Sequence, residues 1–162
     1  MKKLIFLDID GVLNHHLYYM EKKQYLRKAE VGYPMCDIDE SKVALVNRIV
    51  AETGSKVVIS SSWRILYSLF ELKHIFGTMG FVGDIIGVTP IGDSNVFVPR
   101  GAEILTFMRE NGYTLEDTNY IILDDDSDVL LWQQENYFKV DGYCGLTPNI
   151  AYRAINKLNR KY

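Results

Sequence analysis

Two aspartates one residue apart follow a short hydrophobic run near the start of the sequence. Asp8 and Asp10 come directly after Leu4–Leu7, and Gly11 follows them. The like charges of these side chains repel one another unless a positive charge lies close by. The alternative is that the two residues only cap a turn. If the charge is compensated, a carboxylate pair can bind a metal ion, attack an electrophile or move a proton.

A second acidic cluster follows another hydrophobic run. Residues 119–123 lead directly into Asp124, Asp125 and Asp126. Five aspartates in two such clusters indicate a hard divalent cation with oxygen ligands. Mg²⁺ fits best, because it takes one or two carboxylates and usually accompanies a phosphate. We reject an EF-hand calcium loop beginning at Asp124, since Val129 stands where that loop requires glycine.

A bound phosphate would also need hydrogen-bond donors and positive charge. Ser60 ends the apolar run 56–60, and Ser61 follows it, just before an expected helix. Free backbone N–H groups at such a helix start form an anion site, although the serines alone could simply cap the helix. Arg100, at the start of another expected helix, and Arg64 could neutralise phosphate charge. Each arginine could equally be a solvated surface charge.

The elements that would position these residues alternate between strands and helices. This alternation predicts an α/β fold with a mostly parallel sheet and helices on both faces. Ligand sites in such folds lie at the carboxyl ends of the strands, so neighbouring strands would bring Asp8, Asp10, Ser60 and Asp124 to one edge. The expected strands are 4–7, 56–60, 84–88, 119–123 and 137–140, and the expected helices are 40–54, 63–76, 100–111 and 148–160.

The stretch from about residue 14 to 37 interrupts this alternation. It is polar and rich in tyrosine, and we expect an irregular flap or hairpin within a single domain over residues 1–162. The tyrosines of this flap either stack on the bases of a substrate or pack the flap itself. His15 and His16 lie just after the first acidic pair and either contact substrate or face solvent.

Composition sets the class of protein. The chain has 162 residues, 48% of them hydrophobic and 24% charged, which is typical of a globular protein that buries a full core. A net charge of −3 gives no global basic field for nucleic acid, although a local basic groove remains open. Cys36 and Cys144 are far apart, which favours two reduced thiols. Neither a targeting segment nor a membrane span is expected, so we predict a soluble, cytoplasmic protein.

The ordered motifs resemble those of the haloacid dehalogenase-like (HAD) hydrolase superfamily. The segment 8–13, DIDGVL, is similar to the first motif of that family, Ser60 to its second, and Asp124 with Asp125 to its fourth. The third motif usually carries a lysine, for which this sequence offers Arg100 or, less suitably within a helix, Lys73. The combination ISSSWR, PRGAEI and ILDDDSD is also similar to the branch of HAD domains found in RNA-repair proteins.

This resemblance implies a Rossmann-like domain without a cap or with a minimal one. It also implies a Mg²⁺-dependent phosphatase in which Asp8 forms an aspartyl-phosphate and Asp10 is the acid/base. The implied metal ligands are Asp8, Asp10 through its carbonyl, Asp124 and Asp125, and the expected phosphate-binding residues are Gly11, Ser60, Ser61, Arg64 and Arg100.

Three interpretations of the substrate remain open from the sequence. The first is a general phosphomonoesterase acting on nucleotides or other phosphorylated compounds. The second is a phosphatase module for RNA or DNA ends, for which an open, minimally capped site leaves room. The third is a non-catalytic domain that binds a metal or a partner through the same acidic edge. The oligomeric state also remains open.

Overall fold

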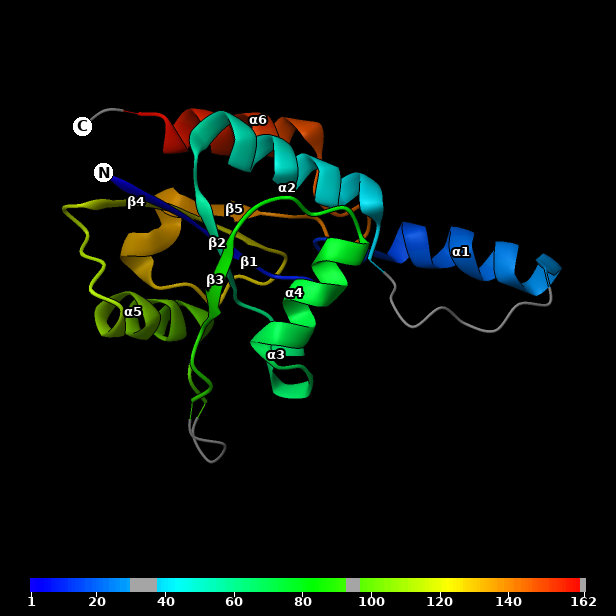
Figure 1. The fold of residues 1–162 in the computed structure, drawn as a ribbon, viewed down its shortest axis with the longest axis horizontal. Coiled ribbons are helices and arrows are strands. Elements are labelled where there is room, and N and C mark those ends of the chain that lie inside the picture. Colours follow the sequence, from blue (N-terminus) through cyan, green and yellow to red (C-terminus); the bar gives the residue numbers. More distant parts are fainter. Residues whose placement is uncertain (30–37, 93–96, 161–162) are drawn as a thin grey trace.

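A five-stranded parallel sheet forms the centre of the protein in the computed structural model, which describes residues 1–29, 38–92 and 97–160. The strand order is β3–β2–β1–β4–β5, and all four pairings are parallel (Figure 1). The prediction of a Rossmann-like, mostly parallel sheet is therefore confirmed. The strands are β1 (Lys2–Leu7), β2 (Lys56–Ile59), β3 (Ile85–Val88), β4 (Thr118–Asp124) and β5 (Tyr137–Lys139).

The two central strands are apolar because helices cover both of their faces. Every residue of β4 is buried, as are Leu4–Leu7 of β1. Continuous apolar runs of this kind are typical of interior strands in a parallel sheet. Leu7 of β1 pairs with Leu123 of β4 on one side and with Ile59 of β2 on the other. Hence the three polar strand ends seen in the sequence lie side by side.

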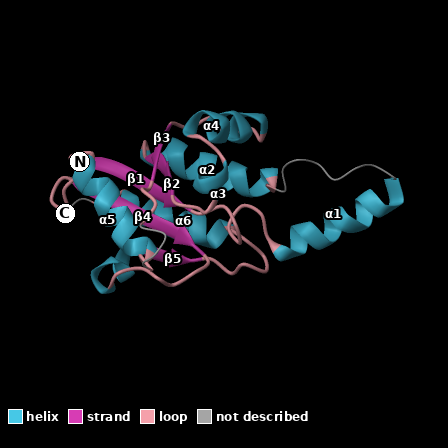
Figure 2. Ribbon diagram, turned by 90° about the horizontal axis from the view of Figure 1, so that it is seen from below, coloured by secondary structure: helices cyan, strands magenta, loops and turns pink. Residues whose placement is uncertain are grey.

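The helices divide between the two faces of the sheet, as predicted (Figures 1 and 2). Side chains alternate along a strand, so Ile5 and Leu7 pack with buried residues of α2, α4 and α6, whereas Leu4 and Phe6 pack with those of α5. The helices are α1 (His16–Ala29), α2 (Glu40–Thr53), α3 (Trp63–Leu66), α4 (Leu69–Thr78), α5 (Arg100–Glu110), α6 (Pro148–Leu158) and the short 3₁₀ helix η1 (Leu131–Asn136).

The single helix predicted over residues 63–76 is wrong, because the structure has two helices there. Ser68 interrupts the run with extended backbone angles and begins α4. Its hydroxyl accepts a hydrogen bond from the backbone N–H of Glu71 at 3.3 Å, and the Glu71 carboxylate accepts one from the Ser68 N–H at 2.7 Å. This reciprocal capping box satisfies free donors at a helix start, so it favours a new helix over continuation of α3.

The stretch after the first acidic pair also differs from the prediction. Residues 16–29 form α1 rather than an irregular segment, and α1 projects away from the sheet (Figures 1 and 2). The sequence signal for this helix is weak, since its first turn has no acidic residue and its apolar residues form no clear stripe. Residues 30–37, including Cys36, lie outside the described part of the chain. In the described residues, the insertion between β1 and α2 is thus one helix, in agreement with a minimal cap.

Two simpler expectations concern thiols and membranes. Cys144 is a free thiol, partly exposed at the surface. Among the described residues, no helix has the length and apolar composition needed to span a bilayer.

The central position of β1 predicts a large effect of truncating Leu7. Leu7 is fully buried next to Asp8, so Leu7→Ala should lower the free energy of unfolding by about 2–5 kcal/mol through lost burial and a cavity. Leu131, which is 85% exposed, provides a matched control. Leu131→Ala should change the free energy of unfolding by less than about 0.5 kcal/mol. Urea unfolding measures both, and equal effects of the two variants would contradict this assignment of the core.

Candidate active site

The loop after β1 turns sharply and leaves Asp8 at the edge of the sheet. The carbonyl of Ile9 accepts hydrogen bonds from the backbone N–H groups of residues 12–14, at 2.9–3.2 Å. Gly11 has a φ of 75°, in the left-handed region that favours glycine. A Cβ atom at Gly11 would also overlap the carboxylate of Asp125. Glycine at this position therefore permits both the turn and the close approach of the second acidic cluster.

Three carboxylates converge at this edge. One oxygen from each of Asp8, Asp124 and Asp125 lies within 4.8 Å of the others. Asp8 is 5% exposed and Asp124 only 1%, whereas Asp125 is half-buried. The neighbouring positions of β1 and β4 produce this cluster, since the backbone N–H of Asp8 donates to the carbonyl of Leu123 at 3.0 Å. The structure thus brings together three of the four predicted metal ligands by their side chains.

Burial raises the pKa values of all three carboxyl groups. The pKa of Asp8 rises to about 6 because burial disfavours its charge, against the lowering effects of the Arg100 charge and a hydrogen bond from Ser61. Burial and the nearby charge of Asp8 raise the pKa of Asp124 to about 7. Burial also raises the pKa of Asp125. Shifts in this direction show that the site lacks enough positive charge of its own.

The acidic cluster fits a hard divalent cation. Oδ2 of Asp124 is buried without a hydrogen-bond partner, an arrangement that costs free energy in a native protein. The Arg100 Nε lies 3.4 Å from this oxygen, at ion-pair distance but without hydrogen-bond geometry. An oxygen-lined group with an unsatisfied buried carboxylate oxygen is the donor set that Mg²⁺ prefers.

The two predicted phosphate-binding arginines lie in different surroundings. Arg100 is next to Asp124, as described, and its Nη1 is 3.9 Å from the Glu103 carboxylate. Arg64 donates to the Glu103 carboxylate and to the carbonyl of Ser61, both at 2.6 Å, and its side chain is 5% exposed. The structure therefore places Arg100 at the acidic cluster and commits Arg64 to a buried ion pair at its border.

The two predicted serines at the end of β2, Ser60 and Ser61, make different hydrogen bonds. Ser60 continues the ladder, because its N–H donates to the Leu7 carbonyl at 2.8 Å, and its Oγ lies 3.5 Å from the hydroxyl of Thr89. The buried hydroxyl of Ser61 instead donates to the carboxylate of Asp8. Ser61 is thus the serine whose side chain meets the acidic cluster.

The Asp10 carboxylate is held apart from that cluster by three donors. Nδ2 of Asn14 and the indole Nε1 of Trp63 both donate to Oδ1, at 2.7 and 3.0 Å. The hydroxyl of Ser62 donates to Oδ2 at 3.2 Å. Asp10 is exposed at the surface of the site. Its side chain therefore has a fixed position next to the cluster and remains reachable from solvent.

Other candidates from the sequence lie elsewhere. Lys73, the alternative third-motif cation, is exposed on α4. Asp126 is exposed, and the carboxylate of Asp128 accepts a hydrogen bond from the backbone N–H of Arg100 at 2.9 Å. Of the two histidines, His15 is buried and its Nε2 pairs with Asp39 at 2.9 Å, so the expectation that it faces solvent is wrong.

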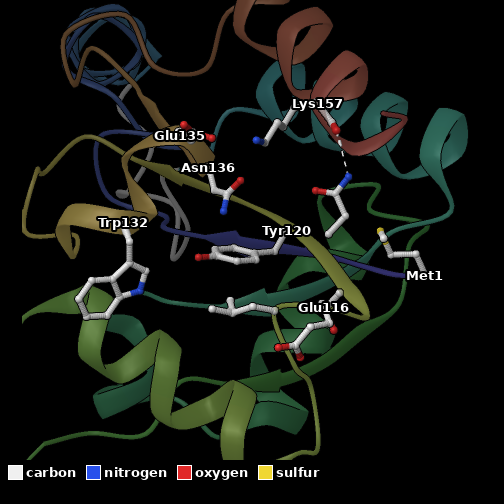
Figure 3. Close-up of a pocket in the computed structure, with 10 residues that line it drawn as sticks. Met1, Glu116, Tyr120, Trp132, Glu135, Asn136 and Lys157 are labelled. Atoms are coloured by element: carbon white, nitrogen blue, oxygen red, sulfur yellow. Dashed lines mark hydrogen bonds between the residues drawn. The ribbon is translucent and has the colours of Figure 1, made fainter. Parts of the chain in front are cut away.

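A large cavity lies at the opposite edge of the sheet (Figure 3). It measures about 600 Å³ and is lined by residues at the amino ends of β1 and β4, with Trp132 and Asn136 of η1 and Lys157 of α6. The amide of Asn119 spans part of its wall by donating to the Lys157 carbonyl at 3.0 Å. None of the clustered aspartates lines this cavity, so the volume of a cavity does not identify the candidate active site.

Comparison with known proteins agrees with the geometry at the carboxyl edge. Residues 4–151 match the family described as the HAD domain in Swiss Army Knife RNA repair proteins. The chain belongs to this family. Neither curated proteins nor solved structures provide a significant match. The resemblance read from the sequence motifs is therefore confirmed at the level of the RNA-repair branch.

The sequence did not identify several side chains that shape this HAD domain's site. Asn14, Ser62 and Trp63 hold Asp10, and Glu103 pairs with Arg64. Ser62 and Trp63 directly follow the predicted serines Ser60 and Ser61, so their position in the sequence could have indicated that they belong to the site. Asn14 and Glu103 act through tertiary contacts that no short motif marks.

The buried carboxylates of the HAD domain predict an effect of Asp124→Asn on stability. The pKa of Asp124 is near 7 in the folded protein and near 3.8 in an unfolded chain, so the native state alone keeps the proton between these values. Stability of the metal-free protein therefore falls as the pH rises from about 4 to 7. Removing the charge should stabilise the protein in EDTA at pH 7.5 by about 1–3 kcal/mol, with no gain at pH 4.

Thermal unfolding with and without Mg²⁺ measures this effect. Wild type should gain stability from Mg²⁺, and Asp124→Asn should lose most of that gain. Asp126→Asn, at an exposed position next to the cluster, is the matched control and should respond to Mg²⁺ as wild type does. An undiminished response of Asp124→Asn would contradict a metal site at this cluster.

Proposed function

We propose that this protein is a Mg²⁺-dependent phosphatase that hydrolyses phosphomonoesters through an aspartyl-phosphate at Asp8. The observation that carries the proposal is the buried convergence of Asp8, Asp124 and Asp125 at the carboxyl edge of a HAD domain. Three carboxylates with raised pKa values and one orphaned oxygen require positive charge. Asp8, Asp124 and Asp125 would hold the ion, which supplies charge that keeps these groups ionised and offsets the charge of the phosphate.

Asp8 has the surroundings of a nucleophile. It lies at a strand end, and its carboxylate receives a hydrogen bond from Ser61 and the field of Arg100, both of which favour the ionised form. In the first step an Asp8 oxygen bonds to phosphorus while the ester P–O bond breaks and the leaving oxygen takes a proton from Asp10. Water then attacks phosphorus and gives its proton to Asp10, which releases phosphate and restores Asp8.

The hydrogen bonds of Asp10 suit a group that carries a proton on one oxygen. Both contacts to Oδ1 come from N–H donors, of Asn14 and Trp63, and neither donor can accept a proton. The Ser62 hydroxyl at Oδ2 can donate or accept. A protonated Asp10 can therefore keep all three contacts only with its proton on Oδ2, and this oxygen would exchange protons with the leaving group and water.

Arg100 is the cation best placed to meet the phosphate. It lies at the acidic cluster and lowers the pKa of Asp8, and it can form a two-point contact with phosphate oxygens. Arg64 would act through its ion pair with Glu103, which orients both arginines at the border of the site. Arg100 therefore takes the place of the usual third-motif lysine in this proposal.

Nucleic-acid ends are the substrate class that we favour within this proposal. The support is membership of a family described by its occurrence in RNA-repair proteins, together with an insertion after β1 that is a single helix in the described residues. Assays with 3′- and 5′-phosphorylated oligonucleotides beside mononucleotides test this preference. Higher kcat/KM on mononucleotides would favour small-molecule hydrolysis instead.

Replacing the nucleophile tests the catalytic proposal. Asp8→Asn should lower kcat on an aryl phosphate by roughly a thousandfold or more, because an amide cannot form the covalent intermediate. Asp84→Asn, which changes an exposed carboxylate paired with Lys56 on the surface, should retain full activity. Wild-type protein without Mg²⁺-dependent turnover of any phosphoester would support the non-catalytic alternative, and an active Asp8→Asn would exclude the covalent route.

The indole contact to Asp10 generates a second prediction. Trp63→Phe keeps an aromatic ring but removes the N–H donor on Oδ1, and should lower kcat about 10-fold, with a smaller change in KM. Thermal unfolding of the same variant separates this effect from a loss of the fold, and the melting temperature should stay close to that of wild type. Trp132→Phe alters the other tryptophan, at the far edge of the sheet, and should leave kcat unchanged. A reduced kcat that only follows a lowered melting temperature would mean that Trp63 only supports the fold.

A further inference from the structure

A second cavity borders the acidic edge on the side of Asp10. It has a volume of about 300 Å³ and is lined by Gly11, Asn14, His15, His16, Tyr19 and Gly142. Asn14 links this cavity to the proposed acid/base, since its side chain donates to Asp10 and its Oδ1 accepts from the Gly11 N–H at 3.0 Å. A group in this cavity would therefore lie next to the residue that protonates the leaving oxygen.

One wall of this cavity continues into an aromatic pair. The rings of His16 and Tyr143 lie 5.3 Å apart between centroids and are inclined by 31°. The pair is anchored through the backbone, because the N–H groups of His16 and Leu17 donate to the carbonyls of Gly142 and Tyr143, at 3.2 and 3.0 Å. Tyr143 is 57% exposed and His16 is exposed. A flat aromatic group in the cavity would pack against an existing pair of aromatic rings, whose backbones are held together.

The helix that leaves this cavity is basic. Its sequence, residues 16–29, contains Lys22, Lys23, Arg27 and Lys28 against one acid, Glu21, so four positive and one negative charge give a net +3. The whole chain has a net charge of −3, so positive charge is concentrated on α1. The helix extends outward from the catalytic edge (Figure 2). A basic element beside an aromatic platform is the combination that binds single-stranded nucleic acid.

We propose that the cavity at the start of α1 binds the base next to the scissile phosphate of a single-stranded polynucleotide end. His16 and Tyr143 are the stacking platform, and α1 is the contact for the strand's backbone. This inference rests on the proposed phosphatase function and deepens it. Stacking on aromatic rings tolerates any base, and a helix of net positive charge attracts phosphates without reading sequence. The subsite therefore selects a strand end of any sequence over a small phosphoester.

Substrate preference measures the contribution of the platform. Tyr143→Ala and His16→Ala should each lower the ratio of kcat/KM for a phosphorylated decanucleotide to that for an aryl phosphate by about 10-fold. Tyr152→Ala removes a tyrosine of nearly equal exposure, 56%, on α6 and should leave both the ratio and the activity unchanged. An unchanged ratio in both platform variants, with Asp8→Asn inactive, would overturn the subsite and leave the phosphatase proposal intact.

Direct binding tests the subsite without turnover. Fluorescence anisotropy of the same labelled oligonucleotide with the full chain should show affinity that falls with salt, and Lys22→Gln combined with Lys23→Gln should weaken binding and flatten that dependence. Tyr143→Ala should raise Kd about 10-fold. If wild type hydrolyses no phosphoester but binds in this way, the subsite stands and the catalytic proposal fails. Binding that is insensitive to these substitutions would falsify the subsite.

Discussion

The mutual repulsion of buried carboxylates is the constraint on which the acidic edge of the sheet depends. The register that pairs Leu7 with Leu123 puts Asp8 and Asp124 at adjacent strand ends, inside the protein rather than on its surface. Two unit charges about 4 Å apart repel by about 4 kcal/mol in partly desolvated surroundings. Arg100 offsets this cost only in part. Burial raises the pKa values of Asp8 and Asp124, and the charge of Asp8 raises that of Asp124 further. A cation is the simplest completion of such a site.

The arginines show how the remaining charge is distributed. Glu103 accepts from Arg64 and also lies near Arg100, so one buried carboxylate faces two guanidinium groups. This arrangement keeps Arg64 from neutralising the aspartates directly, and burial lowers its pKa while the Glu103 charge opposes that effect. An anion entering the site would compete with Glu103 for Arg100. The network therefore holds positive charge at the border of the site without cancelling the acidic cluster.

The sequence predicted the parts of the protein that local patterns control. Apolar runs marked all five strands, and the acids after β1 and β4 pointed correctly to one edge because parallel strands share their carboxyl ends. Helix α1 was missed because its apolar residues have no clear period, and the break at Ser68 was missed because a capping box can stand within an otherwise helical pattern. The donors to Asp10 depend on how the loop after β1 packs against α3, which a linear pattern does not contain.

The two halves of the proposed site differ in how rigidly they are built. The acidic cluster belongs to strand ends in the centre of the sheet, where burial and ladder hydrogen bonds fix each side chain. The cavity at the start of α1 lies between the loop after β1 and residues 142–143. A few backbone contacts and the buried pair of His15 with Asp39 hold these segments. Phosphoryl transfer requires precise positions of the reacting atoms, so it tolerates little displacement of the phosphate. Base stacking and contacts to backbone phosphates tolerate much larger displacements of the strand. Under the proposed function, a strand end of any sequence would therefore adapt to α1 while its terminal phosphate meets an unchanged acidic edge.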